Sequence, residues 1–202
     1  MNPRAESTLE TSYYRKKAAV FRSIILLLCV LGASLALAQA YKPKPGETVM
    51  KLTIERRGDV FILLHTKQAP KTTAQIIRLA NSGFYNGQKW FKVLKDPRPF
   101  LVQFGDPGSK TKPMNDPSLG NGGSGTKVAY EETGKRNVTG AVGLANKDGD
   151  RDSGDSQFYI LLGDYGFLDG KYTVFGQVVS DMDVVRGIKL GDKVTSVVIL
   201  RG

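Results

Sequence analysis

The sequence is poor in the side chains on which many enzyme sites depend. Among its 202 residues there is one cysteine, Cys29, and one histidine, His65. The usual nucleophile–base triads and Cys/His zinc sites need more of these side chains, so both are excluded. The phosphate-loop pattern Gly-x4-Gly-Lys-Ser/Thr is also missing, which excludes that cradle for nucleotides. If the chain is an enzyme, we expect it to work without a metal, a cofactor or a covalent intermediate.

Basic residues outnumber acidic ones, and the formal net charge is +10. They form no stripe interleaved with aromatic side chains of the kind that follows a nucleic-acid backbone, so we expect no nucleic-acid partner. Residues 1–40 hold five basic and two acidic residues, which leaves +7 on the remainder. We interpret this surplus as a solubility feature, with an acidic partner or an anionic membrane face as the alternative.

Residues 23–41 (SIILLLCVLGASLALAQAY) form an uncharged apolar stretch behind the basic segment 15–22. This order is typical of a secretory signal, and two Ala-x-Ala patterns predict cleavage before Gln39 or Tyr41. The stretch also approaches the roughly 20 residues that span a bilayer, so a retained membrane anchor is the alternative. Either way residues 1–40 engage the membrane or the secretion machinery, and we expect the rest in the periplasm or another extracytoplasmic compartment, soluble or anchored.

Residues 41–47 (YKPKPGE) read as a proline-stiffened linker, and residues 48–202 as one globular domain. Alternation of apolar and polar residues predicts eight strands in this domain. Their expected bounds are Val49–Glu55, Asp59–His65, Trp90–Leu94, Phe100–Phe104, Val138–Ala145, Gln157–Leu162, Thr173–Val179 and Val194–Leu200.

Two segments carry apolar residues at helical spacing instead. Lys71–Ser82 has Thr72 or Thr73 placed to cap it and Gly83 to end it, and Asp181–Ile188 is a shorter helix. Eight short strands with two helices favour barrel closure, because closure removes exposed strand edges. We therefore predict a mainly β fold, a closed eight-stranded antiparallel barrel with two short helices, and we expect a monomer.

An acidic segment imitates a metal site. Asp148, Asp150 and Asp152 alternate like the start of an EF-hand calcium loop. The sixth position is Ser153 rather than glycine, and the twelfth is Tyr159 rather than glutamate. We interpret the segment as a solvated loop and predict no metal, with a calcium site as the alternative.

The positive signal is a distributed set of apolar and amide side chains. The simplest interpretation of its aromatic members is that they belong to the barrel core. Their context carries more information. The blocks VQFGDP, GLANKDGDRDSGDSQFYI and FLDGKYTVFGQV, preceded by APKTTAQI and GFYNG, resemble the signatures of the cyclophilins, which are peptidyl-prolyl cis-trans isomerases. The resemblance runs from about residue 49 to the C-terminus. It implies an eight-stranded barrel with two helices, isomerase activity and proline-containing polypeptides as partners.

The resemblance also implies which residues form the pocket for the proline ring. Phe100, Leu101 and Tyr159 match its floor. Leu168 matches directly, whereas Phe167 stands where many members have tryptophan and Tyr172 where the best-known eukaryotic members have histidine. Both aromatic replacements resemble those of bacterial relatives.

A second set of positions matches the residues that hold the substrate backbone. These are Gln103, Ala145, Asn146 and Gln157, and Gly120 resembles the glycine at the pocket rim. The acidic loop departs from the family: it is about two residues longer, and Lys147 replaces an alanine. Contacts to residues preceding the proline are therefore left open.

The clearest departure concerns the cation that family members place beside the prolyl nitrogen. Their Phe-His-Arg-Val segment falls on residues 90–93, so Lys92 replaces the catalytic arginine. A shifted alignment puts Val93 there, which leaves Arg98 or no donor at all. Lysine keeps the charge but lacks the planar fork of arginine, so we expect weaker turnover with substrate binding largely kept.

Rotation about an X-Pro bond faces a barrier of about 20 kcal/mol, because resonance gives the C–N bond double-bond character. An enzyme needs only to bind the twisted amide better than the planar one. The sequence therefore supports a prolyl isomerase that assists the folding of exported proteins. The alternative is a weakly active or non-catalytic proline-binding or chaperone module, motivated by the loss of the arginine.

Overall fold

A computed structural model describes residues 41–147, 149–180 and 182–202, and residues 41–202 form a compact unit. The predicted signal or anchor in residues 1–40 lies outside the described residues. Among those that are described, no helix combines the length and the apolar character needed to span a membrane.

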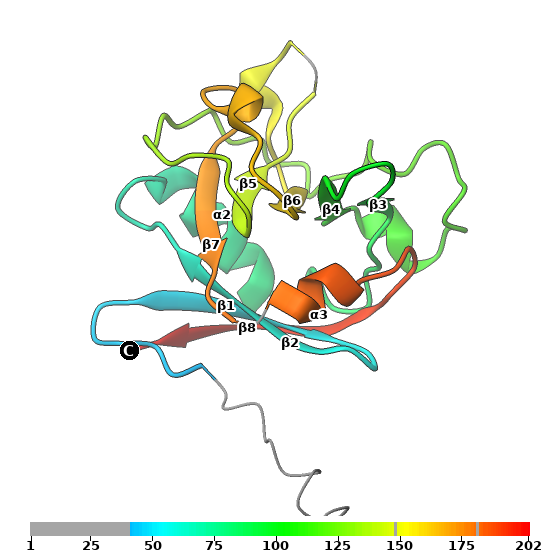
Figure 1. Ribbon diagram of the computed structural model, residues 1–202, viewed down its shortest axis with the longest axis horizontal. Helices are drawn as coiled ribbons and strands as arrows, with labels where there is room; N and C mark the ends of the chain where they lie inside the picture. Colours follow the sequence, from blue (N-terminus) through cyan, green and yellow to red (C-terminus); the bar gives the residue numbers. More distant parts are fainter. Residues whose placement is uncertain (1–40, 148, 181) are drawn as a thin grey trace, which may run out of the picture. The chain divides into compact units, whose positions relative to one another are not determined.

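All eight predicted strands are present, and they pair antiparallel in one curled sheet (Figure 1). The order across the sheet is β3-β4-β6-β5-β7-β2-β1-β8. The strands are β1 (Thr48–Ile54), β2 (Gly58–Leu64), β3 (Lys92–Leu94), β4 (Leu101–Phe104), β5 (Ala141–Leu144), β6 (Phe158–Leu161), β7 (Val174–Val178) and β8 (Val194–Arg201).

The prediction of a closed barrel overstates the closure. The end strands β3 and β8 do not pair with each other. Instead the segment just before β3 bonds to the segment that enters β8: Trp90 N donates to Asp192 O (3.0 Å), and Gly87 N donates to Val194 O (2.8 Å). The segment 87–90 then continues into β3, which pairs with β4. One stretch of chain thus bonds first near β8 and then to β4, and the sheet closes only through this irregular segment.

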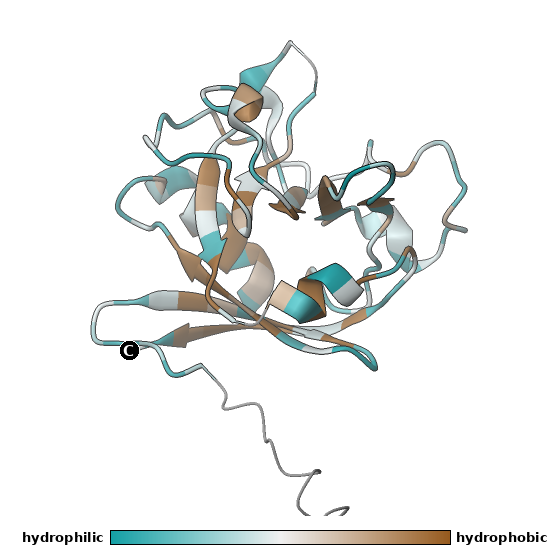
Figure 2. Ribbon diagram, in the orientation of Figure 1, coloured by the Kyte–Doolittle hydropathy of each residue, from teal (hydrophilic) through white to brown (hydrophobic). Residues whose placement is uncertain are grey.

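The two faces of the sheet have different roles. On β4, Val102 and Phe104 point into the main core, and on β6 so do Phe158 and Ile160. The residues between them face outward, because successive strand side chains alternate between faces. Figure 2 shows the hydrophobic residues concentrated on the strands and the hydrophilic ones in the connecting loops.

The helices α2 (Pro70–Asn81) and α3 (Met182–Gly187) contribute to the same core, α2 packing on β8 and α3 on β2. Gly83 ends α2 as predicted, with φ +71°. The predicted threonine cap is wrong, because both threonines lie inside the helix. The cap comes from Glu131, which accepts hydrogen bonds from Lys71 N (2.9 Å) and Thr72 N (2.8 Å). The carboxylate binds the free N–H groups of the first turn, where its charge also favours the helix dipole.

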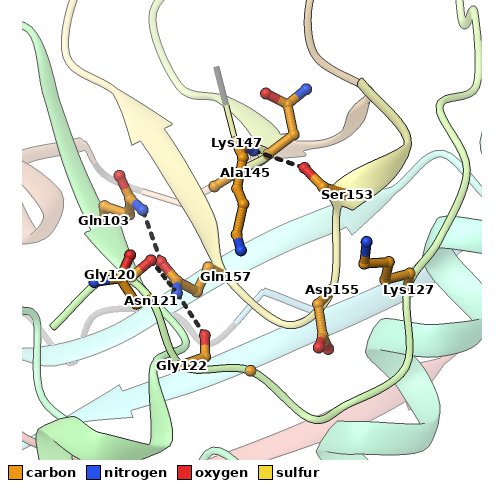
Figure 3. Close-up of a pocket in the computed structure, with 12 residues that line it drawn as sticks. Gln103, Gly120, Asn121, Gly122, Lys127, Ala145, Lys147, Ser153, Asp155 and Gln157 are labelled. Atoms are coloured by element: carbon orange, nitrogen blue, oxygen red, sulfur yellow. Dashed lines mark hydrogen bonds between the residues drawn. The ribbon is translucent and has the colours of Figure 1, made fainter. Parts of the chain in front are cut away.

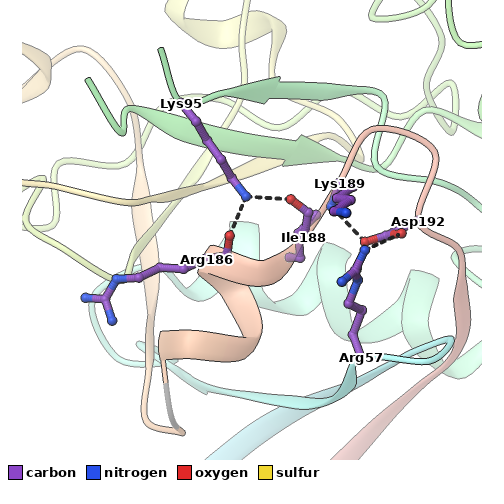
Figure 4. Close-up of polar contacts among 6 residues, drawn as sticks. All are labelled: Arg57, Lys95, Arg186, Ile188, Lys189 and Asp192. Carbon is purple, nitrogen blue, oxygen red and sulfur yellow. Dashed lines mark hydrogen bonds and ion pairs between the residues drawn. The ribbon is translucent and has the colours of Figure 1, made fainter. Parts of the chain in front are cut away.

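A polar cluster fixes the turn after β3 (Figure 4). Lys95 Nζ donates to the carbonyl oxygens of Arg186 and Ile188 (2.6 Å to Ile188) at the end of α3. Beside it Arg57 Nε donates to Asp192 Oδ2 (2.7 Å). A cation satisfies the unpaired carbonyls of a helix end, so Lys95 ties the β3–β4 turn to α3.

Candidate functional site

A row of side chains crosses the outer face of the sheet. Lys92 on β3 lies opposite Gln103 on β4, Gln103 lies opposite Tyr159 on β6, and Tyr159 lies opposite Gly143 on β5. Opposed residues of antiparallel strands project to the same face. A Cβ atom on Gly143 would lie 2.2 Å from the Tyr159 ring, so only glycine leaves room for the phenol.

A cavity of about 440 Å³, here called the larger cavity, lies over this row. Ten of the thirteen site residues predicted from the sequence line it, and three further residues complete the lining. The ten are Lys92, Phe100, Leu101, Gln103, Gly120, Ala145, Asn146, Tyr159, Leu168 and Tyr172, and the three are Leu94, Asn121 and Lys147. The volume lies in the range of small-ligand pockets.

The apolar side of the larger cavity is a small second core on the outer face. Leu101, Tyr159 and Leu168 are buried there, with Phe100 and Tyr172 packed against them. The rings of Tyr159 and Tyr172 meet edge to face at 5.6 Å. A wall of buried, closely packed apolar side chains suits a small apolar ring.

Tyr159 is held by its hydroxyl group as well as by packing. The phenol donates to Asn137 Oδ1 (2.7 Å), and Asn137 in turn donates from N (2.7 Å) and Nδ2 (3.0 Å) to Asp169 Oδ1. Burial raises the pKa of Tyr159 far above its ordinary value. The phenol therefore stays neutral and serves as structure rather than as an acid or base.

The amide side chains on the polar side form a chain. Gln157 Nε2 donates to Gly120 O (2.9 Å) and Gly122 O (2.6 Å), so its Oε1 is left to accept from Gln103 Nε2 (2.9 Å). Asn146 Nδ2 donates to Lys171 O (3.0 Å). These bonds orient Gln103 and Asn146 and leave the side-chain oxygen of each as an acceptor at the cavity wall.

The two candidate cations occupy different places. Lys92 is exposed and lines the larger cavity, and its ammonium group has no ion pair or hydrogen bond with any described residue. Arg98 is exposed in the β3–β4 turn and lines neither this cavity nor the one below. Val93 packs against the main core on the inner face. The alignment that assigns Val93 to the family arginine therefore points it away from the site.

Phe167 also lies outside the lining. Its side chain is 61% exposed in the turn η3 (Gly166–Leu168), with its ring 6.1 Å from that of Phe100 and 5.9 Å from that of Tyr165. It extends the apolar surface beyond the cavity rather than closing it.

A smaller cavity of about 160 Å³ adjoins the larger one (Figure 3). Gln157, the thirteenth predicted residue, lies here. The two cavities share six residues: Gln103, Gly120, Asn121, Ala145, Asn146 and Lys147. The smaller cavity adds Gly122, Gly123, Lys127, Ser153, Asp155 and Gln157.

Two buried or half-buried carboxylates hold the long loop that walls both cavities. Asp106 accepts from Gly108 N (2.7 Å), Gly120 N (2.7 Å) and Gly122 N (3.0 Å). Asp155 accepts from Ser124 N (3.0 Å) and Gly125 N (2.9 Å). The loop is thus anchored where it meets the cavities.

The described residues contain no group of three or more His, Cys, Asp or Glu side chains placed to hold a metal. Asp148 lies outside the described residues. Asp150 Oδ1 accepts from Asp152 N (3.1 Å), and Asp152 Oδ1 accepts from Tyr130 N (2.8 Å). His65 lines neither cavity, and burial lowers its pKa.

Sequence reasoning missed several wall residues. Leu94 could have been found, since it lies two positions after Lys92 on the same strand face, and Asn121 follows Gly120 directly. Lys127 and Asp155 come from separate loops, and no local pattern in the sequence brings them together.

Comparisons with known proteins agree with this geometry. The family described as cyclophilin type peptidyl-prolyl cis-trans isomerase/CLD matches residues 49–201. A probable peptidyl-prolyl cis-trans isomerase of Brucella suis is 35% identical over 175 residues, covering 85% of this chain and 87% of the relative. The human peptidyl-prolyl cis-trans isomerase-like 1 is 34% identical over 134 residues, covering 65% and 74%.

Solved structures show the same fold. A crystal structure of a Cryptosporidium parvum cyclophilin type peptidyl-prolyl cis-trans isomerase has a TM-score of 0.65 at 22% identity, covering 77% of this chain and 99% of that one. A second structure of it, in the presence of the dipeptide Ala-Pro, has a TM-score of 0.63. The family match spans the whole curled sheet and both cavities, and the chain belongs to the cyclophilin-type peptidyl-prolyl cis-trans isomerases.

Proposed function

We propose that the larger cavity is where this isomerase twists the X-Pro bond of proline-containing polypeptides. The observation that carries the proposal is the convergence of an apolar floor, oriented amide groups and a free cation on one cavity. Phe100, Leu101 and Tyr159 immobilise the proline ring. Gln103 and Asn146 hold the neighbouring peptide groups, so that one side of the amide is fixed while the other rotates.

In this proposal Lys92 stabilises the twisted amide. When resonance is lost, the prolyl nitrogen regains a lone pair that can accept a hydrogen bond, whereas the planar amide offers none there. A donor aimed at that nitrogen therefore binds the transition state better than the ground state, which is what lowers the barrier. Lys92 fits this role because it shares a cross-strand row with Gln103 and Tyr159 and has no competing partner among the described residues.

The test is NMR exchange spectroscopy on a short blocked Ala-Pro peptide. We expect Lys92→Ala to lower kcat/KM on the order of 10²-fold, as for loss of one transition-state donor. Arg98→Ala is the matched control, since it removes a nearby cation outside the lining, and it should change little. Full activity in Lys92→Ala with a large loss in Arg98→Ala would assign the role to Arg98 instead.

A binding module is the second candidate function, and the lysine at the arginine position is what favours it. It predicts that peptide titration gives shifts of the cavity resonances while the exchange rate of the peptide stays at its uncatalysed value. Acceleration by the unaltered protein would rule this candidate out.

We further propose that the protein acts as a monomer on exported chains during their folding. The apolar stretch at residues 23–41 supports export. The larger cavity opens at the surface on the outer face of the sheet, which suits an extended segment of a client that has not yet folded.

A further inference from the structure

The smaller cavity adjoins the larger one. Because the two cavities share six lining residues, a chain with its proline in the larger cavity brings a neighbouring side chain to the mouth of the smaller one. A cavity of about 160 Å³ is large enough for one polar side chain. Its chemical character therefore bears on which substrates are preferred.

Two lysine side chains point into the smaller cavity. In Figure 3 the ammonium groups of Lys127 and Lys147 both project into the space, from different loops. Neither ammonium has an ion pair or hydrogen bond with any described residue. The backbone beneath Lys147 is fixed, since its N donates to Ser153 Oγ (2.7 Å) and its O accepts from Asp150 N (2.9 Å). Val128 N, next to Lys127, donates to Gly154 O (2.7 Å).

The acidic residue in the lining, Asp155, forms no ion pair with either cation, so the lining keeps a net positive charge. The Asp155 carboxylate turns toward the glycine-rich loop (Figure 3), where it accepts from Ser124 N (3.0 Å), Ser124 Oγ (2.5 Å) and Gly125 N (2.9 Å). Asp150 and Asp152 are not in the lining. A concave wall with two unpaired cations concentrates a positive potential inside it.

We propose that the smaller cavity selects substrates with an aspartate or glutamate side chain close to the proline. A carboxylate placed there pairs with Lys127 and Lys147 at once, whereas a lysine or arginine is repelled by both. This inference rests on the proposed function of the larger cavity, which positions the proline. It makes the isomerase selective for acidic-proline segments rather than for proline alone.

The test uses blocked peptides that differ in one residue. Glu, Gln or Lys is placed in turn at each position within three residues of an Ala-Pro bond, and kcat/KM is measured by NMR exchange and Kd by titration. We expect Glu to exceed Gln by about fivefold or more at one position, as two partly exposed ion pairs allow, and Lys to fall below Gln. Raising the salt concentration should shrink the ratio, since salt screens exposed charges.

Variants connect the preference to the cavity. In the double variant Lys127→Gln/Lys147→Gln the Glu-to-Gln ratio should fall to about one, and Lys147→Glu should shift the preference toward the Lys peptide. Lys171→Gln is the matched control, since Lys171 is exposed but lines neither cavity, and it should keep the ratio. A ratio of one in the unaltered protein, or an unchanged ratio in the double variant, overturns the inference.

The outcomes separate this inference from the proposed function. Equal acceleration of the Glu, Gln and Lys peptides overturns acid selection and leaves the isomerase proposal standing. If no peptide is accelerated, the proposal of catalysis at the larger cavity is wrong. The Kd ratios of the same peptides then show by themselves whether the smaller cavity selects acidic side chains.

Discussion

At the scale of single residues, the floor of the larger cavity depends on one buried hydrogen bond. Tyr159 is 3% exposed and Asn137 1%, and the bond between them passes over Gly143. Asn137 also donates to Asp169, whose pKa is lowered by the backbone and side-chain hydrogen bonds from Asn137 and by Arg136 nearby. The floor is thereby tied to the loop that carries Leu168 and Tyr172.

We expect Tyr159→Phe to lower the free energy of unfolding by about 1–2 kcal/mol, because Asn137 Oδ1 is left buried without a donor. The ring remains, so peptide Kd should change little. Urea unfolding and peptide titration measure the two effects. Tyr130→Phe is the control: its phenol donates to Glu132 at an exposed site, and it should cost less than about 0.5 kcal/mol. Equal losses in both variants would contradict the role of Asn137.

Lys92→Arg tests the same site by a variant that is expected to gain activity rather than lose it. The planar guanidinium offers several donors in a fixed fork and is less strongly hydrated than an ammonium. We expect kcat to rise severalfold while KM stays nearly constant, because the added interaction forms only with the twisted amide. NMR exchange at saturating peptide gives kcat directly. A lower kcat in Lys92→Arg would show that the site is built around the shorter ammonium.

At the scale of elements, the sequence predicted the regular parts of the fold and missed contacts between distant loops. Alternation located every strand, and Gly83 marked the end of α2. The prediction of the helix cap was wrong because Glu131, which caps α2, lies far along the chain from it. Two threonines stood at positions near the start of the helix where a cap is common, so they were predicted instead. The site followed the same division: Gln103 and Tyr159 lie on strands that alternation located, and the resemblance to the cyclophilins assigned them to the site, whereas no sequence pattern brought Lys127 there.

The role of the loop between β4 and β5 in shaping the cavities can be tested at Asp106. Asp106 is 2% exposed and accepts three backbone hydrogen bonds. In Asp106→Asn an NH₂ group faces N–H donors of the loop, so we expect a loss of about 2–3 kcal/mol in stability. Gly120, which lines both cavities, loses its anchor, so peptide Kd should also rise. Chemical unfolding and titration measure both.

Asp116→Asn is the matched control for this loop. Asp116 accepts from Ser118 N (2.9 Å) and Ser118 Oγ (2.5 Å) but lines neither cavity. We expect its peptide Kd to stay that of the unaltered protein. A normal Kd in Asp106→Asn as well would mean that the cavity wall does not depend on the carboxylate.

At the scale of the whole molecule, the chain divides at about residue 40. Residues 41–202 form a compact unit with its own core, and the family match begins at residue 49. All residues that line the two cavities lie at or after residue 92. We therefore expect residues 41–202 expressed alone to fold and to show the kcat/KM of the full chain on a short peptide. A molten or inactive product would mean that the N-terminal 40 residues take part in folding.

The N-terminal 40 residues should decide location rather than activity. Expressed in a bacterium with two membranes, the full chain should appear outside the cytoplasm, and residues 41–202 should stay inside. Mass spectrometry separates the two remaining interpretations: a chain beginning at Gln39 or Tyr41 marks a cleaved signal, and an intact chain in the membrane fraction marks an anchor. Leu27→Arg places a charge in the middle of the apolar stretch, at a cost of about 3 kcal/mol for insertion into the bilayer, and should trap the protein in the cytoplasm. Cytoplasmic location of the unaltered full chain would remove export from the proposal, and the isomerase site would then act on proteins folding inside the cell.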